Sequence, residues 1–138
     1  MTATALAVLG YVAWTLGLLL ILACLRSYLT LSGARAANSF RPDGSDVSPF
    51  SERLCRAHAN CYESFPIVGG LLLLALATRQ THITDPLALW LLLARVGQST
   101  THLISTSALA VQVRFSFFLV QFAIAVWWLI ALLGSSAA

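Results

Sequence analysis

The chain has 138 residues, of which 59% are hydrophobic and only 9% are charged, and its net charge is +3. Soluble domains carry a charge on roughly a quarter of their residues, so this composition excludes an ordinary soluble domain and indicates a single-domain membrane protein. The basic residues are all arginines and are scattered along the chain, which excludes a basic surface for nucleic acid.

The first predicted helix covers about residues 3–26 and carries no charge before Arg26. A stretch of about 20 apolar residues crosses the hydrocarbon core of a bilayer, so this helix is predicted to span the membrane. We do not expect a signal peptide, because the segment lacks a basic start and is longer than a typical signal core. A polar connection follows, from about Ser27 to Val47.

The second predicted helix covers about residues 49–78 and begins with two helix-start signals. Ser48 can cap the helix, and Pro49 suits the first helical position. Its apolar part, residues 65–77, is too short to cross a membrane alone, so the polar residues before it must also lie in the bilayer. Pro66 is predicted to kink the helix.

The polar part of this second helix places Arg53, Arg56, Asn60 and Glu63 at spacings of three and four residues. On a helix such side chains share one face. Charged groups are costly in hydrocarbon, so we expect this face to look inward, toward partners, water or a ligand.

The third predicted helix covers about residues 86–107, and Asp85-Pro86 repeats the cap-plus-proline start. It carries a second polar stripe at three-and-four spacing, which is also expected to face inward. The members of this stripe are Arg95, Gln98, His102 and Ser105.

The fourth predicted helix covers about residues 113–133, with Arg114 at its start. Gln121 lies near its middle and is expected to contact another helix. Trp127 and Trp128 lie near its end and are predicted to anchor it at the membrane interface.

The distribution of arginines predicts the orientation in the membrane. Arginines flank the first and third connections, whereas only Arg79 flanks the second. Because cytoplasmic loops carry an excess of basic residues, the first and third connections are predicted to be cytoplasmic and both termini to lie outside. The polar stripes then lie in the cytoplasmic half of the bilayer.

Three interpretations of the polar stripes stay open on spacing alone: a structural network between helices, a ligand site, or a proton or ion pathway. The arginines outnumber the acidic residues near them, and spare guanidinium groups suit carboxylates or phosphates. No metal site is expected, because His58 and His102 have no second ligand at zinc-like spacing. Cys24, Cys55 and Cys61 are expected to be free packing thiols.

The segment from Glu52 to Pro66 closely resembles the signature of the MAPEG family, the membrane-associated proteins in eicosanoid and glutathione metabolism. The four-span plan, the chain length and the arginine at the start of the fourth helix also fit, so the resemblance covers nearly the whole chain. The loop that contains Asn38-Ser39-Phe40 is similar to that of bacterial members. The pattern R-A-x-x-N-x-x-E-x-x-P is carried by Arg56, Ala57, Asn60, Glu63 and Pro66.

This resemblance implies an all-α fold, with one four-helix membrane domain over residues 1–138 that assembles as a homotrimer. It also implies an integral protein of the bacterial inner membrane, with glutathione as co-substrate bound between neighbouring subunits near the cytoplasmic face. Arg114 is expected to be catalytic, by stabilising the glutathione thiolate. The residues expected to bind glutathione are Arg26, Arg53, Arg56, Asn60, Glu63, Arg95, Gln98 and His102.

The implied function is a glutathione transferase or peroxidase that acts on lipophilic electrophiles. The alternative is a non-catalytic lipid-binding or scaffold trimer, because enzymes of the leukotriene-synthase type carry tyrosines where this chain has Gln98, His102 and Ser64. A small proton-coupled multidrug exporter ranks below both, since such proteins need a carboxylate in the first helix and this first helix has none.

Overall fold

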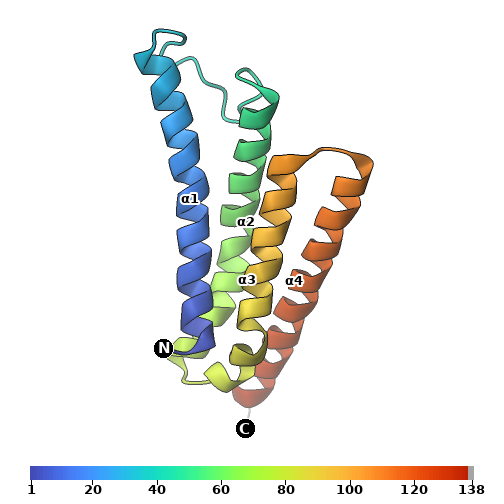
Figure 1. Ribbon diagram of the computed structural model, residues 1–138. Coiled ribbons are helices and arrows are strands. Elements are labelled where there is room, and N and C mark those ends of the chain that lie inside the picture. The colour runs from blue at the N-terminus through green and yellow to red at the C-terminus, as the bar shows by residue number, and fades with distance from the viewer. Residues whose placement is uncertain (137–138) are drawn as a thin grey trace.

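The computed structural model describes residues 1–136, and side-chain burial is described up to residue 135. This part of the chain forms four helices joined by three connections, and both termini lie at the same end of the bundle (Figure 1). The helices are α1 (Ala3–Leu31), α2 (Pro49–Ala77), α3 (Thr81–Ile104) and α4 (Ala108–Ser136). The all-α four-helix bundle predicted from the sequence is confirmed.

Helix α3 lies at the centre of the bundle. It packs against α1, α2 and α4, whereas α1 and α4 stand on opposite sides and make no contact with each other in the described part of the chain (Figure 1). The buried core is shared among all four helices and includes Tyr11, Leu54, Leu72, Leu91 and Trp128. The central place of α3 explains why its polar residues are buried by protein rather than exposed to lipid.

Three of the four helices are long and apolar enough to cross a membrane: α1, α2 and α4. Helix α3 is not among them by composition, because it carries Asp85, Arg95 and several hydroxyl and amide side chains. A helix enclosed by its neighbours does not need a lipid-compatible surface on every side. Helix α3 therefore buries Arg95 and Gln98 against its neighbours and exposes an apolar face that includes Trp90 and Leu93.

The start of α2 is as predicted. The Ser48 hydroxyl accepts a hydrogen bond from the backbone N–H of Ser51 at 3.1 Å, Pro49 occupies the first helical position, and Glu52 lies in the first turn. The Ser48 hydroxyl pairs with one N–H that a helix start leaves free, Pro49 has no N–H to pair, and the charge of Glu52 interacts favourably with the helix dipole. The helix runs on through Pro66, and the predicted kink there stays a prediction.

The predicted end of the first helix near Arg26 is five residues too early. The helix runs to Leu31 and ends where Gly33 adopts a positive φ of 74°. An arginine at a membrane boundary does not interrupt backbone hydrogen bonding, whereas a glycine in the left-handed region turns the chain away from the helix axis. Arg26 therefore lies inside α1.

The predicted start of the third helix at Asp85-Pro86 is wrong. Helix α3 begins at Thr81, so Pro86 lies inside its second turn. The carboxylate of Asp85 does not cap its own helix but accepts hydrogen bonds from the backbone N–H and the hydroxyl of Thr4 in α1, at 2.8 and 2.6 Å. Asp85 therefore joins α3 to α1 instead of capping α3.

The turn between α3 and α4 is shorter than predicted. Helix α3 ends at Ile104 rather than near 107, and α4 begins at Ala108 rather than near 113. The hydroxyl of Ser107 accepts from the N–H of Ala110 at 3.2 Å and so caps α4. Arg114 consequently lies in the second turn of α4, and its side chain is half-buried.

The two tryptophans near the end of α4 do not act alike. Trp127 is largely exposed, as an interface anchor would be, but Trp128 is completely buried in the core. The prediction of an interface anchor is therefore wrong for Trp128, because adjacent residues on a helix point about 100° apart.

Candidate functional site

A buried polar centre lies where α3 meets its neighbours. Arg95 is 2% exposed, and no carboxylate pairs with it among the described residues. A buried cation is costly unless its donors are satisfied. Its companions in this layer of α3 are Gln98 and Ser99, which are also buried.

The charge of Arg95 is balanced by neutral groups. One terminal nitrogen of its guanidinium donates to the side-chain oxygen of Asn60 and to the backbone carbonyl of the same residue, the latter at 3.2 Å. The guanidinium carbon lies 5.6 Å from the centre of the Tyr11 ring, a cation–π contact. The Nε of Arg95 is buried without a partner among the described residues. Arg95 and Asn60, which the resemblance assigns to one site, therefore lie in contact.

Tyr11 ties α1 to this centre. Its hydroxyl donates to the carbonyl of Cys61 at 2.9 Å and lies 2.8 Å from the hydroxyl of Ser64. Ser64 in turn donates to the carbonyl of Asn60 at 2.6 Å. Sequence reasoning missed Tyr11, although Thr4, Tyr11 and Thr15 follow one another at spacings of seven and four residues in a mostly apolar segment and so share a face.

Gln98 and Gln121 join α3 to α4. The amide nitrogen of Gln121 donates to the side-chain oxygen of Gln98 at 3.0 Å, and both side chains are buried. The predicted interhelical contact of Gln121 is confirmed. Gln98 therefore lies in the α3–α4 interface, where its side-chain oxygen is already engaged.

The ends of the helices near the α3–α4 turn hold two further arginines. Arg114 lies 2.8 Å from Nδ1 of His102, which accepts because a guanidinium only donates. Arg53 donates through Nε to the carbonyl of Leu103 at 2.9 Å, in the last turn of α3. Its positive charge is stabilised there by the negative end of the helix dipole.

The polar stripe of α2 divides into two parts. Arg53 and Asn60 face α3, whereas Arg56 and Glu63 are exposed on the outer surface of the chain. Within one chain only Arg53 and Asn60 of this stripe face another helix, so an inward place for Arg56 and Glu63 stays a prediction. At about 100° per residue the four positions cover an arc of about 80°, with Arg53 and Asn60 at the edge that contacts α3 and Arg56 and Glu63 at the other edge.

The exposed part of the stripe carries unused charge. The Arg56 side chain is 63% exposed, and its guanidinium lies 2.7 Å from Glu52, one turn earlier in α2. An exposed pair of this kind contributes little to stability. Glu63 has no ion pair among the described residues. These two side chains are therefore available to a ligand or to another chain.

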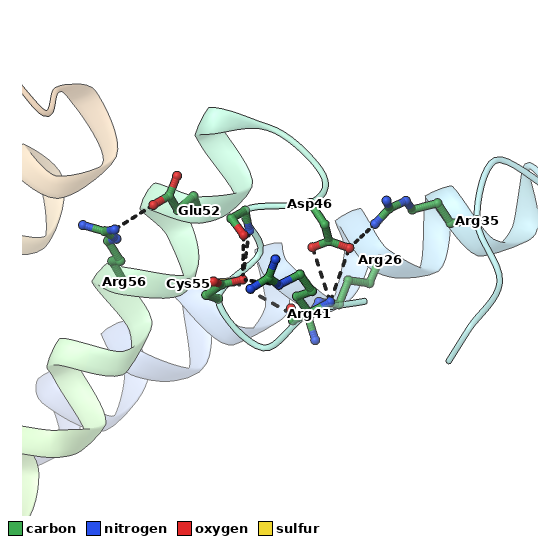
Figure 2. A network of polar contacts seen from close by, with 9 residues as sticks. Arg26, Arg35, Arg41, Asp46, Glu52, Cys55 and Arg56 are labelled. Atoms are coloured by element: carbon green, nitrogen blue, oxygen red, sulfur yellow. Dashed lines mark hydrogen bonds and ion pairs between the residues drawn. The ribbon is translucent and has the colours of Figure 1, made fainter. Parts of the chain in front are cut away.

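Arg26 lies apart from Arg56. It donates to the carbonyl of Arg41 in the loop at 3.1 Å and makes a longer contact with the sulfur of Cys55, 3.9 Å. In Figure 2 the Arg56 side chain points away from this cluster, toward Glu52. Arg26 and Arg56, which the resemblance assigns to one site, thus lie in separate places within the chain.

The loop beside Arg26 is held by its own ion pairs. Asp46 pairs with Arg35 and accepts from the N–H of Arg41 (Figure 2). Burial raises the pKa of Asp46, but these hydrogen bonds lower it more, so that the pKa lies below the ordinary value of 3.8. The backbone N–H and hydroxyl of Ser45 likewise hold the pKa of Asp43 below its ordinary value.

Comparison with known proteins finds one family. The model of the MAPEG family matches residues 4–134, nearly the whole chain. No curated protein and no solved structure matches the chain.

Proposed function

The chain belongs to the MAPEG family, and on that premise we propose that it binds glutathione in the membrane and acts as a transferase or peroxidase on lipophilic electrophiles. The observation that carries the proposal is the pair Arg56 and Glu63, exposed on a helix that is apolar enough to cross a membrane. Charged groups on a membrane-spanning helix need partners. Glutathione offers carboxylates for Arg56 and an ammonium group for Glu63.

Asn60 supports the same site from between these two residues. Arg95 engages the side-chain oxygen of Asn60, so the amide group is held in one orientation by a buried cation. Its nitrogen has no partner among the described residues and can donate to a carboxylate. Arg53 and Arg95 do not contact the ligand in this proposal. They hold α2 against α3 and so position Asn60 and Arg56.

Arg114 is the proposed catalytic residue. One of its nitrogens is engaged by His102, which orients the guanidinium and leaves further N–H donors for a ligand. A cation close to the glutathione thiol lowers the thiol pKa and stabilises the thiolate. The thiolate then bonds to the electrophilic carbon of the substrate, and the leaving group departs with its electron pair.

We further propose that the functional unit is a homotrimer in the bacterial inner membrane, with the loop between α1 and α2 on the cytoplasmic side. Arg56 and Glu63 point out of the subunit, so a second copy is needed to enclose a ligand bound to them. Arg26, which lies away from Arg56 within one subunit, is left outside the proposed site.

Isothermal titration of glutathione against the protein in nanodiscs tests the binding step. Arg56→Gln removes a charge-assisted hydrogen bond, worth about 1.5–3 kcal/mol, so the Kd is expected to rise roughly ten- to hundredfold. Arg79→Gln, in the turn at the other end of α2, is the matched control and should bind as the wild type does. No heat of binding to the wild-type protein would refute the glutathione site.

Turnover tests the role of Arg114. Arg114→Gln is expected to retain glutathione binding within a fewfold but to lower kcat for conjugation of a dinitrohalobenzene by about a hundredfold, the scale of one lost charge-stabilising donor. In the wild type the thiolate absorbance of bound glutathione should be visible near neutral pH and should be lost in the variant. Equal turnover by both proteins would contradict the assignment.

One observation favours the alternative, a non-catalytic lipid-binding or scaffold trimer. Gln98, His102 and Ser64 are each engaged within the subunit, by Gln121, Arg114 and Tyr11 respectively. Glutathione binding to the wild type without conjugation and without reduction of a lipid hydroperoxide would select this alternative.

A further inference from the structure

A groove at the end of α1 carries polar groups that the proposed glutathione site does not use. It has a volume of about 460 Å³ and lies between the last turns of α1 and the loop that follows. Its wall combines hydrogen-bond donors with apolar side chains. The donors belong to Arg26, Ser27, Thr30 and Asn38, and the apolar members include Leu31 and Phe40.

Arg26 brings an uncompensated positive charge to this groove. The two nearby carboxylates are engaged elsewhere, since Asp46 pairs with Arg35 and Asp43 lies 3.7 Å from Arg41. The guanidinium of Arg26 contacts only neutral groups of the described chain, namely the carbonyl of Arg41, the sulfur of Cys55 and the ring of Phe40. Its Nε is buried and has no hydrogen-bond partner there. The groove is thus equipped for an anion.

The surroundings point to a ligand that is partly apolar. Helix α1 exposes large hydrophobic side chains next to the groove, with Tyr28 at 69% and Leu31 at 87% exposure, and more of them toward its middle. The groove itself lies where this apolar helix passes into a polar loop, at the boundary of a predicted membrane span. A free anion would make no use of the apolar surface, whereas a lipid would place its acyl chains along it.

We propose that this groove binds the phosphate headgroup of an anionic phospholipid, with Arg26 as the charged ligand. A phosphate diester offers oxygens to the guanidinium and to the hydroxyl and amide donors of Ser27, Thr30 and Asn38. The bound lipid joins α1 to the loop. This site is separate from the proposed glutathione site, and its test does not depend on glutathione.

Native mass spectrometry of the detergent-solubilised full chain tests the proposal, with phosphatidylglycerol and phosphatidylcholine as the probes. The wild type is expected to retain phosphatidylglycerol in preference to phosphatidylcholine. Arg26→Gln should lower the retained phosphatidylglycerol roughly fivefold, the effect of one basic residue near an anionic headgroup. Arg79→Gln, at the other end of the bundle, should retain it as the wild type does.

Two further measurements keep the test decisive. Asn38→Ala, in the exposed loop, removes a donor without removing a buried group, and should also weaken phosphatidylglycerol retention if Arg26→Gln fails to fold. Equal retention of the two lipids, or unchanged retention in both variants, would overturn the proposal. Displacement of the lipid by millimolar inorganic phosphate would refute the proposal that the ligand is a membrane lipid, and would assign the site to a soluble anion.

Discussion

Arg95 shows how a single polar residue is accommodated in this bundle. It carries a full charge at 2% exposure, and only amide, carbonyl and aromatic groups balance it. Such an arrangement does not stabilise the fold, because the free energy of removing a cation from water exceeds the free energy gained from hydrogen bonds to neutral groups. It positions Asn60 instead, at the point where the exposed charges Arg56 and Glu63 flank it.

The pair Gln98 and Gln121 permits a test of the structural interpretation at the same scale. Gln98→Leu removes one of two acceptors of the buried Gln121 amide nitrogen, which keeps only the carbonyl of Phe117, and is expected to lower the free energy of unfolding by about 1–3 kcal/mol. Gln98→Leu/Gln121→Leu should cost less than the single change. The measurement is the thermal midpoint in detergent together with glutathione titration. The double variant is expected to bind glutathione as tightly as the wild type does. A loss of affinity would show that Gln98 contacts glutathione.

At the scale of elements, two contacts fix α1 at its opposite ends. At its start, Asp85 of α3 accepts from the backbone N–H of Thr4, one of the N–H groups that a helix start leaves unpaired. At its far end, α1 meets the loop whose shape depends on the pair Arg35 and Asp46. The helix is thereby tied to both α3 and the loop.

Asp85→Ala is expected to destabilise the start of α1 by about 1–2 kcal/mol, because a capping acceptor and a favourable charge at a helix N-terminus are both lost. Hydrogen exchange should speed up in the first turns of α1 and leave α4 unchanged. Asp43→Ala, an exposed loop acid, is the matched control. Uniform faster exchange across the bundle would contradict a local capping role.

The loop after α1 should loosen in acid. The pKa of Asp46 is depressed in the folded protein, so the stabilisation from its contacts is complete above the ordinary value of 3.8 and is lost as the pH falls through the lower folded-state value. Limited proteolysis of the loop should therefore accelerate below about pH 4. Asp46→Asn should be cut rapidly at neutral pH and show little further change in acid; wild-type-like protection of this variant would contradict the prediction.

At the scale of the whole molecule, the antiparallel bundle places both termini at one end, and the arginine-rich α1–α2 connection and the short α3–α4 connection at the other (Figure 1). The end with Arg26, Arg35, Arg41, Arg53 and Arg56 is the one expected to face the cytoplasm.

A C-terminal fusion tests this orientation. Alkaline phosphatase attached after residue 138 is expected to be active, because it folds only outside the cytoplasm, and a green fluorescent protein at the same place is expected to be dark. Moving arginines from the first connection to the second should reverse both signals. A fluorescent fusion on the unaltered chain would refute the orientation.

Much of this protein could be predicted from the sequence, because its signals are local. Hydrophobic length predicts the membrane spans, and Ser48-Pro49 marks the start of α2 because the Ser48 hydroxyl accepts from a backbone N–H three residues later. The motif around Asn60 indicates the family. The spacing of Arg53, Asn60 and Arg95 also places polar groups on helix faces correctly. These features depend on a few neighbouring residues and on the chemistry of a bilayer.

Other features depended on which helices meet. Asp85 looks like a cap for its own helix but serves α1, and Trp128 looks like an interface anchor but is buried by its neighbours. The sequence could not decide which edge of the α2 stripe faces α3, because helical periodicity gives relative angles and no absolute direction. Tertiary packing set that direction: it enclosed Arg95 and Asn60, and left Arg56 and Glu63 on the surface where a ligand or a second copy can reach them.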